Sequence, residues 1–188
     1  MKLTFENFKL LDEAEQKYLI DHDYYRFNEM LVGVLSEYRY QHSIEVAKLA
    51  ESLAIKYSIP ANKAYIAGIL HDCTKEWPKE ATNNYMKEYD SDKLIMPSVI
   101  HHQFTAYRYL KKMLNLDEDI LLAIRNHTTG DDEGILSKII YLADKCEPTR
   151  KYDNKSLREL AFINLNQAFI MAKKEVAEVV NGKVKNSI

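Results

Sequence analysis

The sequence predicts an all-α protein made of a single domain. Apolar residues recur at three- and four-residue spacing, which places them on one stripe of successive helices. Five glycines and four prolines punctuate the 188 residues, and no segment alternates apolar and polar residues long enough to indicate a sheet. With 46% hydrophobic residues, the chain is long enough to bury one core.

The first 35 residues are predicted to form an N-terminal helical extension whose role the sequence leaves open. Two helices are expected there, over residues 11–20 and 24–37. The second of them carries an apolar stripe made of Phe27, Leu31, Val34 and Leu35.

The main domain opens with a helix predicted over residues 42–57, which puts His42 at a helix start. Ser58-Ile59-Pro60 ends this helix and starts another, because proline fits the first turn of a helix. Residues 64–70 are a continuous apolar run that indicates a buried helix. His71 and Asp72 follow at its end, so this helix delivers two polar side chains toward the interior.

Further helices are predicted over residues 98–114, 117–127, 135–146 and 155–181. Residues 73–98 are expected to form a covering loop that holds a short helix, and residues 128–134 a loop rich in glycine and aspartate. Pro148 ends the helix that carries Asp144, and Asn181-Gly182 caps the last helix. The domain therefore spans residues 36–182, and residues 183–188 form a short tail.

Charge and composition exclude several functions. A formal net charge of -2 and a pI near 6.3 give no basic footprint for nucleic acid. The chain has no run of 18 apolar residues and no secretory signal at its start, so we expect a cytoplasmic protein without a membrane segment. Cys73 and Cys146 show neither a disulfide framework nor zinc-binding spacing and are interpreted as small buried side chains.

Six residues with metal-binding side chains stand near helix ends: His42, His71, Asp72, His102, His127 and Asp144. Each histidine taken alone fits a surface or hydrogen-bonded core residue, and His22 is assigned to that interpretation. Together, four imidazoles and two carboxylates suit two transition-metal ions such as iron, manganese, cobalt or zinc, whereas magnesium prefers more oxygen ligands. A bridging Asp72 would hold the ions about 4 Å apart and activate a shared water.

Four sequence motifs extend this set, and each contains at least one of the proposed ligands. They are Arg39-Tyr40-Gln41-His42-Ser43, His71-Asp72-Cys73-Thr74-Lys75, Ala123-Ile124-Arg125-Asn126-His127-Thr128 and the run from Ile140 to Arg150. Together they resemble the HD superfamily of metal-dependent phosphohydrolases, an all-α HD-domain helical bundle. The last motif narrows the resemblance to the YqeK group, whose members split diadenosine tetraphosphate symmetrically into two ADP. The resemblance covers residues 36 to about 180.

The resemblance implies roles for individual residues. One iron would be held by His42, His71, Asp72 and Asp144, and the other by Asp72, His102 and His127. Lys75, Thr128 and Arg150 match positions that contact the phosphates of a nucleotide, and Asp72 and Lys75 are the expected catalytic residues. The expected substrate-binding set is His42, Asp72, Cys73, Thr74, Lys75, His102, His127, Thr128, Asp144 and Arg150.

The third motif departs from the family, which shows Trp-His followed by small residues. This chain has His101-His102-Gln103-Phe104-Thr105-Ala106. We align His102 with the ligand because Ala106 then falls where the family places glycine or alanine. His101 is the alternative ligand if the register shifts by one residue.

The expected reaction is attack by a metal-bridging hydroxide on the phosphorus beside the central anhydride oxygen, with ADP as the leaving group. Lys75 and Arg150 would neutralise the polyphosphate. One alternative is a purine nucleotide-binding sensor with little turnover, and another is hydrolysis of a different nucleotide. The expected partners are the dinucleotide substrate and an ADP- or GDP-type product. A homodimer is also considered, and base preference and the physiological metal stay open.

Overall fold

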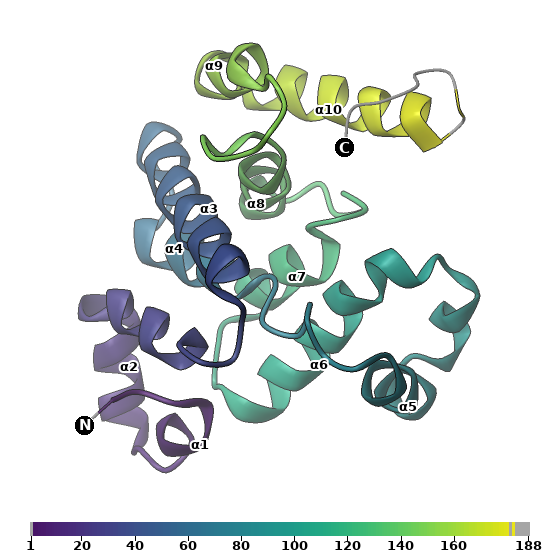
Figure 1. Cartoon of the computed structure of the whole chain (residues 1–188). Coiled ribbons are helices and arrows are strands. Elements are labelled where there is room, and N and C mark those ends of the chain that lie inside the picture. Colours follow the sequence, from purple (N-terminus) through teal and green to yellow (C-terminus); the bar gives the residue numbers. More distant parts are fainter. Residues whose placement is uncertain (1, 181, 183–188) are drawn as a thin grey trace.

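Helices make up this fold, and residues 2–180 and 182, which the computed structural model describes, contain no strand. An isolated bridge between Val32 and Leu35 is the nearest feature to a sheet in that part of the chain. The prediction of an all-α, single-domain protein is thus confirmed. Figure 1 shows α1 and α2 at one end of the molecule and α9 and α10 at the other, with α3, α4, α7 and α8 between them.

The N-terminal segment contains α1 (Phe5–Phe8), α2 (Glu13–His22) and the 3-10 helix η1 (Tyr24–Leu31). Thr4 and Asp12 start the two α-helices through capping boxes, which satisfy free backbone amides. The prediction of an α-helix over 24–37 was wrong. The chain turns at Gly33, whose φ of 82° is left-handed, and Ser36 then caps a new helix.

The centre of the fold is the pair α3 (Glu37–Lys56) and α4 (Ala61–Leu70). Gly68 lets the two helices approach closely, because a Cβ atom there would lie 2.7 Å from the Cα atom of Ala47. Residues 64–70 are all buried, as the apolar run predicts. His42 lies in the second turn of α3, not at its start, because the helix begins five residues earlier than expected.

The middle of the chain forms α5 (Lys79–Tyr89), two short 3-10 helices and then α6, α7 and α8. Proline precedes both α5 and η3, where its fixed φ suits the entry into a helix. The bounds are η2 (Ser91–Ile95), η3 (Ser98–Ile100), α6 (His101–Met113), α7 (Glu118–Asn126) and α8 (Ile135–Cys146). The last of these has the predicted bounds, and α6 starts three residues later than predicted.

Two helices, α9 (Lys155–Ile163) and α10 (Leu165–Val180), replace the single helix predicted over 155–181. Asn164 takes an extended conformation between them, and its side chain accepts a hydrogen bond from the backbone of Gln167. Asn181 of the predicted C-terminal cap lies outside the described residues, as does the predicted tail 183–188. Gly182 has a φ of 69°.

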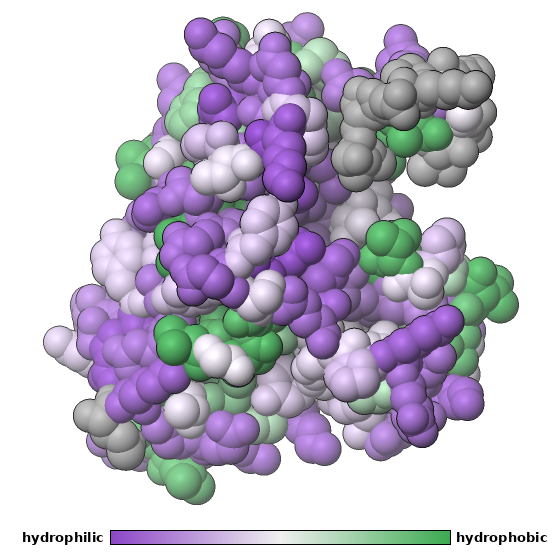
Figure 2. Space-filling view, viewed as in Figure 1, coloured by the Kyte–Doolittle hydropathy of each residue, from purple (hydrophilic) through white to green (hydrophobic). Residues whose placement is uncertain are grey.

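The surface is mainly polar on the face that Figure 2 shows, with separate apolar patches on it. Exposed apolar side chains such as Leu10, Ile95 and Ile163 come from distant parts of the sequence. Among the described helices, none has both the length and the apolar character needed to cross a membrane.

Candidate metal centre

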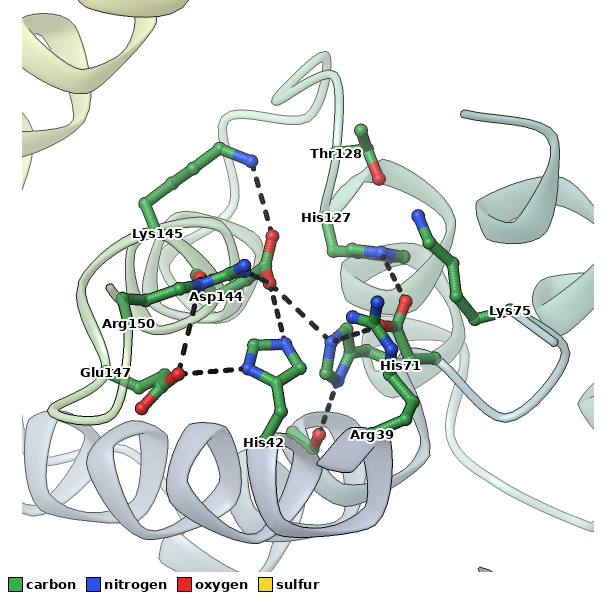
Figure 3. A network of polar contacts seen from close by, with 12 residues as sticks. Arg39, His42, His71, Lys75, His127, Thr128, Asp144, Lys145, Glu147 and Arg150 are labelled. Atoms are coloured by element: carbon green, nitrogen blue, oxygen red, sulfur yellow. Dashed lines mark hydrogen bonds and ion pairs between the residues drawn. The ribbon is translucent and has the colours of Figure 1, made fainter. Parts of the chain in front are cut away.

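The predicted ligands come together from five helices and the turns that follow them. His42 projects from α3 and Asp144 from the last turns of α8, while His102 lies in the first turn of α6. His71 and His127 occupy the C-cap positions of α4 and α7, where an apolar helix ends at the centre of the molecule. In Figure 3, the labelled histidines and Asp144 point toward one another.

Asp72 belongs to two groups of buried ligand atoms. One group is His42, His71 and Asp72, and the other is Asp72, His102 and His127; within each, the candidate ligand atoms all lie within 4.8 Å of one another. Asp144 adjoins the first group, with its Oδ1 atom 3.1 Å from Nε2 of His42 and 3.8 Å from Nε2 of His71. The carboxylate of Asp72 is shared between two sets of imidazoles, and this arrangement suits a pair of metal ions.

Three of the histidines are held with Nε2 directed into the centre. Nδ1 of His71 donates to the carbonyl of Gly68 at 2.7 Å, and Nδ1 of His127 donates to the carbonyl of Ile124 at 2.7 Å. Nδ1 of His42 lies 3.1 Å from the carboxylate of Glu147 and donates to it. In His71 and His127 these contacts place the proton on Nδ1 and leave Nε2 available to a metal, whereas Nε2 of His42 faces Asp144.

The centre fits a metal because it contains a buried ligand atom without a partner. Nε2 of His71 is buried and has no hydrogen-bond partner among the residues that the structure describes. A buried polar nitrogen of this kind destabilises a protein unless something binds it. A metal ion, which needs the unprotonated nitrogen, would satisfy it.

Charge inside the centre favours the ligand forms of these side chains. Burial would raise the pKa of Asp72, but His71, His102 and His127 hold that pKa well below its ordinary value. Burial lowers the pKa of His127 to about 4, despite the opposing effect of Asp72. Burial likewise lowers the pKa of His102. At neutral pH the Asp72 carboxylate is therefore ionised and the rings of His102 and His127 are neutral, which are the forms that bind metals.

Four basic side chains border the centre. Nη1 of Arg39 lies 2.8 Å from Oδ2 of Asp72, and Nζ of Lys145 lies 3.3 Å from Oδ2 of Asp144. Lys75 places its Nζ atom 3.2 Å from Nε2 of His102, and burial lowers the pKa of this lysine. Arg150 donates to the backbone carbonyl of Asp144 at 2.9 Å through Nε. Cationic side chains of the kind that bind phosphate oxygens therefore lie next to the candidate metal centre.

The structure distinguishes His102 from His101, the alternative candidate ligand in the third motif. His102 belongs to the buried group with Asp72 and His127, whereas Nε2 of His101 donates to the carbonyl of Met96 at 2.9 Å. Thr128 also lies at the centre, with its hydroxyl oxygen 3.4 Å from Nε2 of His102. His102 is thus the histidine placed to act as the ligand.

Cys73 and Thr74, two residues of the expected substrate-binding set, are buried in the packing around the centre. The hydroxyl of Thr74 donates to the carbonyl of His102 at 3.1 Å and lies 2.7 Å from the hydroxyl of Thr105. Burial raises the pKa of the Cys73 thiol. The hydrogen bonds of Thr74 hold the segment after Asp72 against α6.

Arg39, Lys145 and Glu147 were not assigned a role from the sequence. The position of Arg39 could have indicated its place beside the centre, since it lies three residues before His42 and therefore on the same face of α3. Glu147 follows the end of α8 and reaches His42, 105 residues away in the sequence. A contact between residues so far apart in the sequence cannot be predicted from the residues around either one.

The fold and the centre together define a helical protein with a buried histidine–aspartate cluster suited to divalent metal ions. The model of the HD domain matches residues 39–149. The chain belongs to the HD domain family.

Two named relatives show which members of the HD domain family the chain is similar to. It is 37% identical over 145 residues to the symmetrical bis(5'-nucleosyl)-tetraphosphatase of Bacillus subtilis strain 168, a match that covers 74% of this chain and 78% of that protein. It is 35% identical over 160 residues to the probable nicotinate-nucleotide adenylyltransferase/Ap4A hydrolase of Mycoplasma genitalium. That match covers 80% of this chain but 45% of the Mycoplasma protein, so the chain spans less than half of its length.

A solved structure has the same fold. The predicted HD superfamily hydrolase involved in NAD metabolism from Clostridium acetobutylicum aligns with a TM-score of 0.76 and 34% sequence identity. The alignment covers 87% of this chain and 90% of that one. The arrangement of helices described above is therefore shared with a crystallised HD hydrolase.

Proposed function

We propose that the chain is a metal-dependent hydrolase that splits diadenosine tetraphosphate symmetrically into two molecules of ADP. The observation that carries this proposal is the position of Asp72, whose buried carboxylate belongs to both groups of histidines. The relatives named as symmetrical tetraphosphatases support the choice of substrate. We propose that two metal ions bind, one in each group.

The metals would supply the electrophilic part of the chemistry: two ions beside Asp72 would polarise a phosphoryl group and lower the pKa of a water toward neutrality. The donor set of four imidazoles and two carboxylates suits iron, manganese, cobalt or zinc, and the resemblance to the HD phosphohydrolases favours iron as the resident metal. A cytoplasmic location and a homodimer stay predictions.

The basic side chains at the border of the centre would bind the polyphosphate. Lys75 and Arg150 keep the roles expected from the sequence, and Arg39 and Lys145 join them. Arginine can donate two parallel hydrogen bonds to a phosphate, which orients the chain of phosphates as well as neutralising it. Thr128 adds a hydroxyl group beside His102.

Symmetrical cleavage places little demand on a proton donor, because ADP is a stable leaving group. The main requirement is that negative charge on the phosphates be neutralised where it grows during the reaction. Four cations around two carboxylates meet that requirement. A complete ligand set also argues against a nucleotide sensor without turnover.

Product analysis tests this proposal. The purified protein is incubated with diadenosine tetraphosphate and Mn²⁺ or Fe²⁺, and the nucleotides are separated by ion-exchange chromatography. We expect ADP alone, with no activity in Asp72→Ala and full activity in the control Asp131→Ala, which alters an exposed acid of the 128–134 loop. A mixture of AMP and ATP would contradict symmetrical cleavage, and tight ADP binding without hydrolysis would support the sensor.

A further inference from the structure

Gln103 directly follows His102 on α6, and its side chain is completely buried. Its Oε1 atom accepts hydrogen bonds from the backbone amides of Thr128 at 3.1 Å and Thr129 at 3.3 Å. Its Nε2 atom donates to the hydroxyl of Thr129 at 3.4 Å. Every one of these contacts reaches the turn that follows α7.

That turn carries part of the metal centre. His127 stands at the end of α7, and its Nε2 atom lies 3.0 Å from Nε2 of His102. The hydroxyl of the next residue, Thr128, lies 3.4 Å from the same nitrogen of His102. Two consecutive residues of α6 thus face the turn, one through its imidazole and the other through its amide.

The backbone of the turn explains why a side-chain acceptor is needed. The helix ends at Asn126, and the amide of Gly130 returns to the carbonyl of Asn126 at 2.7 Å, with Gly130 in the left-handed region at a φ of 64°. The amides of Thr128 and Thr129 point to α6, where the Oε1 atom of Gln103 accepts from both. Buried backbone amides require such a partner.

We infer that Gln103 is a positioning residue, whose amide sets the separation of α6 and the turn after α7 and so places His127 and Thr128 against His102. It acts through these residues and is not itself a ligand. The inference rests on the proposed function for the assignment of His102 and His127 as metal ligands.

Two substitutions distinguish the effect of the Gln103 hydrogen bonds from the effect of the volume that its side chain fills. Gln103→Met keeps a long side chain but removes both polar atoms, so the two backbone amides lose their acceptor. Gln103→Glu keeps an acceptor for both amides and can accept from the hydroxyl of Thr129. Gln16→Met is the matched control, because the Gln16 amide is likewise hydrogen-bonded to the backbone, here by donating to the carbonyl of Leu11 at 2.9 Å, but in the N-terminal segment.

The experiment measures Mn²⁺ binding to the full chain by isothermal titration and by electron paramagnetic resonance, which distinguishes a coupled pair of ions from a single one. We expect wild type, Gln103→Glu and Gln16→Met to bind two ions. In Gln103→Met, the affinity for one ion should fall about 10- to 100-fold, as when groups that orient metal ligands are removed. The signal of the coupled pair should weaken accordingly.

A purely structural role gives a different result. In that case Gln103→Met lowers the melting temperature of the metal-free protein but binds both ions as tightly as wild type, and the inference fails. If Gln103→Met does not fold, Gln103→Asn, which retains an amide but is too short to reach the turn, takes its place with the same expected loss. If wild type itself does not bind two ions, the proposed function fails instead.

Discussion

The Nδ1 atom of His42 lies 3.1 Å from the Oε1 atom of Glu147, and both side chains are buried. This carboxylate orients the imidazole so that its other nitrogen, Nε2, faces Asp144 at 3.1 Å. Burial acts to lower the pKa of His42, but the hydrogen bonds to Asp144 and Glu147 raise it above its ordinary value. The pair joins the second turn of α3 to the C-cap of α8 beside the candidate metal centre.

Replacement of Glu147 by glutamine should weaken metal binding. Glu147→Gln keeps the shape of the side chain but removes the charge that makes the His42 ring a stronger donor to a metal. We expect the Mn²⁺ affinity to fall about tenfold or more, as is typical when such a partner is removed. Calorimetric titration measures this, with the exposed Glu133→Gln as control. Equal affinities in both variants would show that the carboxylate has no influence on the metal.

Loss of the Lys75 charge should slow hydrolysis without removing the metals. The Nζ atom of Lys75 lies within 3.2 Å of the His102 ring, where it can reach a phosphate bound at the centre. Because one preorganised donor contributes on the order of 10²-fold to the rate of such reactions, Lys75→Met should reduce kcat/KM for diadenosine tetraphosphate by about that factor. The exposed Lys112→Met serves as the control in steady-state kinetics. If Lys75→Met lowers only the metal content, Lys75 supports metal binding and does not contact the substrate.

A methyl group at Gly68 should destabilise the protein, although alanine is intrinsically the better helix former. The added Cβ would lie 2.7 Å from the backbone of Ala47, so α3 and α4 would have to separate. Overpacking of this kind costs about 1–3 kcal/mol. Urea unfolding of Gly68→Ala should show that loss, and metal affinity should fall too, since the carbonyl of Gly68 orients His71. Gly33→Ala, where a Cβ has open space but φ is 82°, should leave metal affinity unchanged.

The pair of Ser36 and Glu76 should make stability depend on pH. The carboxylate of Glu76 accepts from both the hydroxyl and the backbone amide of Ser36 at 2.6 Å, which holds the start of α3 against the segment after Asp72. The hydrogen bonds from Ser36 lower the pKa of Glu76 below its ordinary value of 4.5. A carboxyl group with a lowered pKa in the folded state stabilises that state above pH 4.5, and the contribution disappears as the pH falls through the folded-state pKa.

The measurement is the unfolding free energy of wild type and Glu76→Gln in urea at several pH values. The difference between them should stay constant from neutral pH to about pH 5.5 and shrink toward pH 3. Glu80→Gln, an exposed position on α5, should show no such trend. A difference that grows on acidification would reverse the sign required by a lowered pKa.

Much of the fold was predictable because it follows from apolar periodicity and from residues that stop helices. The bounds of α8 match the prediction, since an apolar stripe marks the helix and Pro148 follows its end. The 3-10 helix η1 and the break at Asn164 were missed. The two helix breaks each involve one residue that leaves the helical conformation, Gly33 or Asn164, within a sequence whose apolar spacing continues.

The six candidate ligands were predicted by residue type and by motif, and the structure brings all six side chains together. Their supporting residues were not, because those contacts join segments that are far apart in the sequence. Glu147 reaches His42 over 105 residues, and Arg39 reaches Asp72 over 33. Gln103 was visible only as a departure from a motif, and its role becomes apparent once α6 and the turn after α7 lie side by side.

Anomalous X-ray scattering from crystals grown with Mn²⁺ tests the central claim most directly, because it locates each ion against the side chains. We expect two peaks on either side of the Asp72 carboxylate, one contacted by His42, His71 and Asp144 and the other by His102 and His127. A single peak, a peak bound by His101, or two peaks that do not share Asp72 would contradict it.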